Sequence, residues 1–223
     1  MMRNAGLDMA EERARLLAAI MPHVPFDGWS EPAFRAAVAD LALDPDLARV
    51  ICPRGAVDLA VEYHRAGDRA MTEALASHDL AALKYSARVA LAVRLRLELA
   101  DRELVRRGAA VFALPANLAT GSALIWGTAE AIWTALGDSS RDLNWYTKRM
   151  TLSAVYSATV LYWMGDESEG SADSWAFLDD RIGNVMQFEK LKGSVLKNRF
   201  VKGLMEKVQA PMPRSAPGRE AQR

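Results

Sequence analysis

The sequence predicts an all-α fold, with a small helical head followed by a longer helical body. Apolar residues recur at helical spacing along almost the whole chain, and no segment alternates apolar and polar residues as a half-buried strand would. Proline, glycine and serine residues separate the periodic stretches. The chain has 223 residues, of which 51% are apolar and 25% charged, which is ordinary for a globular protein.

The N-terminal part has the pattern of a helix-turn-helix head. Ser30 is a suitable N-cap, and Pro32 fits the first turn of the helix that follows it. The proline-containing segment 22–29 separates this helix from the one before it. Three short helices and a longer fourth one are expected over residues 9–20, 30–43, 45–51 and 53–77.

Longer helices are expected in the rest of the chain. They are predicted over residues 79–107, 116–136, 144–164, 174–191 and 194–209, and the prolines after residue 210 favour a frayed tail. The predicted domains are therefore a head over residues 1–52, a helical body over residues 53–192, and an amphipathic helix with its tail over residues 193–223.

The sequence contains no recognisable catalytic or metal-binding motif. Cys52 is the single cysteine, and the three histidines show no HxxxH or HExxH spacing. The acids of the polar loops lack the Glu-x-x-His repeat of a di-iron bundle, and there is no glycine-rich phosphate loop. We therefore expect no enzymatic activity, no catalytic residue, no metal and no cofactor.

Targeting and membrane-spanning segments are also not recognised. No secretory signal precedes the first helix, and no run of about eighteen apolar residues exists. These observations favour a cytoplasmic location or a chain from which a targeting segment has already been removed.

The charge of the head argues against DNA binding. Residues 30–62 contain six acids, against the three basic residues Arg35, Arg49 and Arg54. Lysine and arginine side chains that neutralise phosphates dominate DNA affinity, so this head is poorly suited to a nucleic acid.

Large aromatic side chains concentrate between residues 126 and 177. This stretch holds nine of the seventeen aromatics: Trp126, Trp133, Trp145, Tyr146, Tyr156, Tyr162, Trp163, Trp175 and Phe177. Trp145 and Tyr146 follow a polar turn at a predicted helix start. Neighbouring helix positions point about 100° apart, so both cannot enter the core equally. The pair is either an interface hot spot, a gate over an apolar cavity, or ordinary packing between two helices.

The C-terminal helix is predicted to be amphipathic and basic. Residues 190–223 carry nine basic residues and two acids. An apolar face beside basic residues is typical of a helix that lies on a membrane surface, although docking on the protein's own body is the alternative. The residues that would contact the membrane are Leu196, Phe200, Val201, Leu204 and Met205, with Lys197, Arg199 and Lys202.

One segment carries a family signature. Residues 136–149, LGDSSRDLNWYTKR, resemble the signature of the ninth COQ protein family, the lipid-binding accessory proteins of ubiquinone biosynthesis. Supporting matches are residues 22–29 (PHVPFDGW), 53–55 (PRG), 126–128 (WGT), 161–162 (LY) and 175–178 (WAFL).

This resemblance implies a fold like that of TetR regulators, in which the DNA-binding role has been lost. It further implies a homodimer that binds isoprenoid quinone-like lipids in its body, docks the di-iron demethoxyubiquinone hydroxylase, and contacts the membrane through its last helix. A bacterial member would act at the cytoplasmic face of the inner membrane, and a eukaryotic one at the matrix side.

The site residues expected on this basis form two groups. The patch for the partner and for lipid access comprises Leu143, Asn144, Trp145, Tyr146 and Arg149. By apolar character and spacing, the lipid cavity is expected to be lined by Trp126, Ile132, Trp133, Val155, Tyr156 and Phe177.

The predicted function is non-enzymatic. The chain would present isoprenoid quinone intermediates to the hydroxylase, with bound isoprenoid lipid or phospholipid in place of a cofactor. The alternative is a TetR-type transcriptional regulator that senses an apolar ligand.

Overall fold

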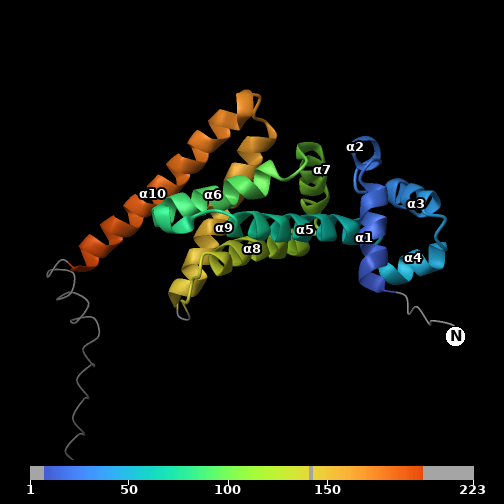
Figure 1. Cartoon of the computed structure of the whole chain (residues 1–223), viewed down its shortest axis with the longest axis horizontal. Coiled ribbons are helices and arrows are strands. Elements are labelled where there is room, and N and C mark those ends of the chain that lie inside the picture. Colours follow the sequence, from blue (N-terminus) through green and yellow to red (C-terminus); the bar gives the residue numbers. More distant parts are fainter. Residues whose placement is uncertain (1–7, 141–142, 198–223) are drawn as a thin grey trace, which may run out of the picture. The chain divides into compact units, whose positions relative to one another are not determined.

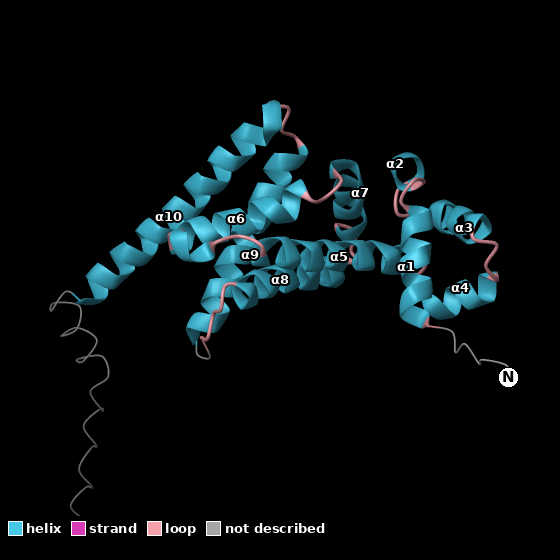
Figure 2. Ribbon diagram, in the orientation of Figure 1, coloured by secondary structure: helices cyan, strands magenta, loops and turns pink. Residues whose placement is uncertain are grey.

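A computed structural model describes residues 8–140 and 143–197, and every regular element in these two ranges is a helix (Figure 2). The α-helices are α1 (Met9–Ile20), α2 (Val24–Asp27), α3 (Glu31–Asp40), α4 (Pro45–Ile51), α5 (Ala56–Ala76), α6 (Tyr85–Glu98), α7 (Arg102–Phe112), α8 (Leu118–Ala135), α9 (Leu143–Met164) and α10 (Ala172–Lys197). Short 3-10 turns cover Leu80–Ala82 and Glu169–Ser171. The all-α prediction is confirmed.

The chain forms two compact units, Met1–Ile182 and Gly183–Arg223. The first unit contains the predicted head together with most of the predicted body. The second begins ahead of the predicted C-terminal domain, within α10, and its described part is the helical segment 183–197. Most of the predicted membrane-contacting residues lie outside the described residues, and only the backbone is described for Leu196 and Lys197.

The head packs against one end of α5 (Figure 1). Ser30 caps α3 as the sequence predicts, accepting a hydrogen bond from the first turn of that helix. Asp8 and Asp44 cap α1 and α4 in the same way. The Trp29 indole donates to the backbone carbonyl of Leu104 at 3.1 Å, which ties the head to α7. A shared core therefore joins head and body, formed by Leu16, Ile20, Val24, Trp29, Phe34, Ile51, Leu59 and Leu104 among others.

Two predicted helix boundaries are wrong. The helix expected over residues 79–107 is divided into a 3-10 turn, α6 and α7. The break occurs because the Asp101 carboxylate accepts hydrogen bonds from the backbone N–H groups of Glu103 and Leu104, starting a new helix. The break expected between residues 191 and 194 is not present, since α10 continues through Gly193 to Lys197.

A buried ion pair joins three helices of the body. Arg96 of α6 is only 2% exposed, and its Nε donates to Oδ1 of Asp68 on α5 at 2.7 Å. The Arg96 guanidinium also donates to the backbone carbonyl of His64 at 3.0 Å. The Thr128 hydroxyl of α8 donates to the same Asp68 oxygen at 2.9 Å. These bonds fix α5, α6 and α8 relative to one another.

Gly67 makes room for this ion pair. A Cβ atom at position 67 would lie 2.6 Å from Cζ of Arg96, and the guanidinium cannot move aside without breaking its bonds to Asp68 and His64. We predict that Gly67→Ala lowers the free energy of unfolding by about 1–3 kcal/mol, measured by urea denaturation.

The matched control is Gly127→Ala in α8, where a Cβ would meet no atom within 4 Å. It should leave stability unchanged or raise it by up to about 1 kcal/mol, because alanine favours the helix. Equal stability of the two variants would contradict the role given to Gly67.

Candidate functional site

An aromatic patch lies at the start of α9. We define it by Trp126, Trp145, Tyr146 and Met150. The ring centroids of Trp145 and Tyr146 are 4.7 Å apart in an edge-to-face arrangement, and those of Trp126 and Trp145 are 5.9 Å apart. Tyr146 is 57% exposed and Met150, one helical turn later, is 64% exposed. The patch therefore offers a contact surface of large side chains to solvent.

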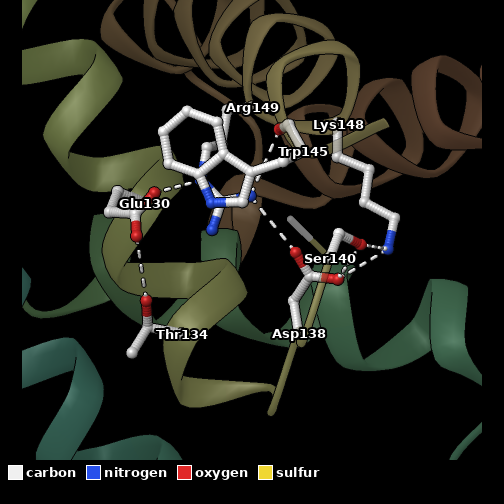
Figure 3. Close-up of polar contacts among 7 residues, drawn as sticks. All are labelled: Glu130, Thr134, Asp138, Ser140, Trp145, Lys148 and Arg149. Atoms are coloured by element: carbon white, nitrogen blue, oxygen red, sulfur yellow. Dashed lines mark hydrogen bonds and ion pairs between the residues drawn. The ribbon is translucent and has the colours of Figure 1, made fainter. Parts of the chain in front are cut away.

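A buried arginine supports the patch from beneath. Cζ of Arg149 lies 4.0 Å from the centroid of the Trp145 ring, a cation–π contact (Figure 3). The guanidinium donates to the Trp145 carbonyl at 3.2 Å and to Oδ2 of Asp138 at 3.1 Å, and its Nε bonds to Glu130. Its bond to Glu130 is the main reason that the pKa of Arg149 rises above its usual value, and Asp138 adds to the effect. Arg149 thus remains charged while only 2% exposed.

Asp138 connects the preceding turn to α9. Its side chain is 3% exposed and accepts hydrogen bonds from Lys148 Nζ at 2.6 Å and from the Ser140 hydroxyl at 2.8 Å, as well as from Arg149 (Figure 3). Burial alone would raise the pKa of Asp138, but the bonds from Lys148, Ser140 and Arg149 outweigh it and lower that pKa to about 2. Gly137 before it has φ of +76°, a conformation that favours glycine. The signature segment is therefore a structural unit that orients the start of α9.

The structure places the predicted patch residues as follows. Asn144 and Tyr146 are exposed and Trp145 is half-buried, while the side chain of Leu143 lies outside the described part. Arg149 was expected to belong to this contact patch, but its side chain is only 2% exposed. Its charge is satisfied by the buried carboxylate of Asp138 and by that of Glu130, whose side chain is 40% exposed, so Arg149 positions Trp145 instead of facing solvent.

An apolar cavity of about 280 Å³ lies between α5, α7, α8 and α9, with Trp29 in its wall. Leu104 and Val105 of α7, with Leu124 and Ile125 of α8, contribute much of the apolar lining. Polar groups come from the side chains of Tyr63, His64 and Tyr156, together with two serines. At its edge lie Leu118 and Leu161, which are 57% and 67% exposed. A mostly apolar cavity with a few polar groups is typical of a small-molecule site.

One of the six predicted cavity residues, Tyr156, lines this cavity. Trp126 belongs to the aromatic patch. Trp133 stacks on Tyr85 with centroids 5.7 Å apart, and Phe177 stacks on Tyr162 at 4.6 Å. Ile132 and Val155 are buried but not part of the cavity lining. Lipid binding at any of these residues stays a prediction. The sequence signal for the cavity was the small residues Gly108, Ala109 and Gly121, which line it on α7 and α8.

Two arginines of the head are engaged by acids. Arg49 pairs with Glu31 and lies over the Phe34 ring at 4.8 Å, and Arg54 pairs with Asp58 at 2.8 Å. These pairs reduce the positive charge that the head could offer to a phosphate backbone.

Within residues 8–140 and 143–197, no group of three or more histidine, cysteine, aspartate or glutamate side chains is placed to hold a metal ion. The described helices also include none with the length and apolar character needed to cross a membrane.

Comparison with known proteins finds sequences similar to this chain. A model of the COQ9 family matches residues 118–189, which include the aromatic patch, the Asp138 turn and Arg149. The human protein "Ubiquinone biosynthesis protein COQ9, mitochondrial" is 28% identical over 202 residues, covering 86% of this chain and 63% of the human protein. The Xenopus tropicalis protein of the same name is 29% identical, covering 82% of this chain and 61% of its own length. The chain thus spans just under two thirds of the length of these relatives.

The fold comparison agrees with the resemblance seen in the sequence. The crystal structure of the TetR transcriptional regulator from Nitrosomonas europaea superimposes with a TM-score of 0.63, covering 78% of this chain and 97% of that one. At 19% identity this likeness concerns the fold alone. The TetR-like fold and the resemblance to the COQ9 family are both confirmed.

The buried position of Arg149 leads to a stability prediction. Arg149→Met would leave Asp138 and Glu130 without their shared cation, and we expect the free energy of unfolding to fall by about 2 kcal/mol or more. Chemical denaturation followed by circular dichroism measures this loss.

The control is Arg69→Met, which removes an arginine that is 59% exposed and paired with Glu62. A surface pair of this kind contributes less than about 1 kcal/mol. If both variants show the same small loss in the free energy of unfolding, Arg149 does not hold the patch in place.

Proposed function

We propose that this chain, a relative of the COQ9 proteins of ubiquinone biosynthesis, is a non-enzymatic accessory protein that binds an isoprenoid lipid and presents it to a partner enzyme at a membrane surface. The observation that carries this proposal is the exposed aromatic patch supported by a buried arginine. Such a feature is suited to recognition of a partner.

The patch has the composition and rigidity of an interface hot spot. Tryptophan and tyrosine are enriched at hot spots because they bury large areas at low cost in conformational entropy. Trp145 is held by Arg149 before any partner arrives, and preorganisation of this kind raises affinity. The partner that the family resemblance implies is the di-iron demethoxyubiquinone hydroxylase.

The cavity supports the lipid-binding part of the proposal. Its volume of about 280 Å³ lies near the lower end of small-molecule pockets, so it suits a ring with a short part of a tail. The exposed Leu118 and Leu161 at its edge give a longer apolar tail a route out. We expect isoprenoid quinone intermediates or phospholipid as the bound species.

Membrane attachment, the homodimer and the location belong to the same proposal. The basic and apolar residues of segment 196–205 support reversible contact with an anionic membrane surface. In a bacterium this would be the cytoplasmic face of the inner membrane. The curated relatives are described as mitochondrial, which corresponds to the matrix side. The ion pairs of Arg49 and Arg54 favour this function over the alternative of a DNA-binding regulator.

Substitution in the patch tests partner binding. We expect Trp145→Ala to weaken the affinity for the hydroxylase about tenfold or more, as removal of a hot-spot aromatic does. Phe26→Ala is the matched control, because Phe26 is an aromatic of the head that is 84% exposed. Surface plasmon resonance with both variants gives the comparison, and a Trp145→Ala affinity equal to that of the native protein refutes the docking role.

Removal of residues 198–223 tests membrane contact. The shortened chain should stay folded but no longer sediment with vesicles that contain anionic lipid, because each lost basic residue near the surface contributes roughly 1 kcal/mol. Vesicles of neutral lipid are the control and should retain little of either protein. Undiminished sedimentation of the shortened chain would show that another surface contacts the membrane.

A further inference from the structure

The connection from α7 into α8 exposes an uncharged apolar surface. It comprises residues 113–119, with the sequence ALPANLA, and we call it the apolar loop. Six of its seven residues are exposed, among them Leu114 at 55% and Leu118 at 57%. No charged residue occurs anywhere between residues 108 and 129. An exposed apolar surface of this kind indicates contact with a partner or with a membrane.

Contacts at its base hold the apolar loop in place. The side-chain amide of Asn117 donates a hydrogen bond to the Val111 carbonyl at 3.2 Å, which ties the loop to the end of α7. At Gly121, α8 approaches α7 so closely that a Cβ atom would lie 2.8 Å from Cβ of Phe112. The turn is therefore fixed, with both of its leucines exposed to solvent.

The apolar loop also forms part of the cavity wall. Ala113 and Leu118 line the cavity from this side. Leu161 of α9 lines it as well and is 67% exposed. These exposed leucines mark the entrance of the cavity, so the surface that the apolar loop contacts adjoins the bound ligand.

Two arginines lie beside this entrance. Arg54 donates to the hydroxyl of Thr120, the residue that follows the apolar loop, at 3.3 Å. Arg106 donates to the carbonyl of Met164, a residue of the cavity lining, at 2.8 Å. The two arginine side chains are 49% and 54% exposed, whereas the acids paired with them are only 17% and 33% exposed. Positive charge next to an apolar surface is complementary to an anionic lipid surface.

The composition of the apolar loop favours a lipid bilayer over a protein partner. Hot spots between proteins are enriched in tryptophan, tyrosine and arginine and contain few leucines. The aromatic patch has that composition, whereas the apolar loop consists of leucine, alanine, proline and one asparagine. Leucine is among the residues that enter lipid most favourably. The two surfaces are therefore suited to different partners.

We propose that the apolar loop inserts Leu114 and Leu118 into the surface of an anionic membrane, so that the cavity opens onto the lipid. This contact is separate from residues 196–205 and acts together with them, because a small apolar insertion alone gives only marginal attachment. The inference rests on the proposed function in taking the ligand of the cavity from a membrane. An apolar ligand then passes between bilayer and cavity without being exposed to water.

A polarity-sensitive fluorophore tests the insertion. The full-length Ala116→Cys variant is labelled with nitrobenzoxadiazole at the new thiol, since Cys52 is fully buried. Vesicles contain phosphatidylcholine and phosphatidylglycerol in equal amounts. We expect them to shift the emission to the blue and nitroxide-labelled lipid to quench it, because the label leaves water. The control is Ala76→Cys, at an exposed alanine at the end of α5, whose emission should not change.

An unlabelled variant measures what the insertion contributes. Leu114→Asn should weaken the affinity of the full-length chain for the same vesicles about tenfold, because the burial of one leucine in lipid is lost. Leu99→Asn is the matched control, since Leu99 is 53% exposed and also lies at a helix end, that of α6. Its affinity for the vesicles should equal that of the native protein.

Sedimentation of the labelled protein with the vesicles separates the outcomes. If the protein sediments while the label at residue 116 stays in water, the inference is overturned and membrane contact through residues 196–205 stands. Equal vesicle affinity of Leu114→Asn and the native protein also overturns it. If the full-length chain does not sediment at all, both this inference and the membrane contact of the proposed function are wrong.

Discussion

The buried pair of Arg96 and Asp68 is the constraint on which the body of this protein depends. A guanidinium that is 2% exposed is tolerated only because Asp68 and the His64 carbonyl satisfy it, since an unpaired buried charge costs several kcal/mol. These bonds join α6 to α5, the bond from Thr128 to Asp68 adds α8, and the position of the guanidinium requires glycine at position 67. Thr128 of the same network lies 2.8 Å from Nε2 of His64, which lines the cavity, so the network that stabilises the fold extends to the cavity wall.

Arg149 has the same structural role at the aromatic patch. It too is 2% exposed and held by carboxylates, here Asp138 and Glu130. In both places a compensated arginine lies behind a candidate binding surface and presents no free charge to it. A rigid, uncharged surface suits the recognition of an apolar lipid or of a partner's apolar face, because neither binding event then has to break an ion pair.

The sequence predicts the helices well because their caps and apolar spacing are local signals. The start of α4 after Asp44 is an example. Prediction from the sequence fails where tertiary contacts determine a helix boundary or the burial of a side chain. Asp101 divides a long periodic stretch by capping α7, and its backbone N–H donates to the hydroxyl of Tyr63, 38 residues away. Arg149 looks exposed in a polar segment, yet its position depends on Glu130, one helix earlier. The cavity is harder still to predict, because its wall combines residues that lie far apart in the sequence, from four helices and the head.

The cavity and the aromatic patch both include residues of α8 and α9, but single substitutions can change one of them without the other. Ile125 lines the cavity while its neighbour Trp126 belongs to the patch, and Tyr156 of the cavity lies on the same helix as Trp145. A change in the packing of α8 against α9 would therefore affect both surfaces at once. His64 lies on α5, outside this shared pair of helices. Trp145 lies near the start of α9. Substitutions at distant positions without shared partners have additive effects. A departure from additivity in the double variant at His64 and Trp145 would therefore measure communication between the proposed lipid and partner sites.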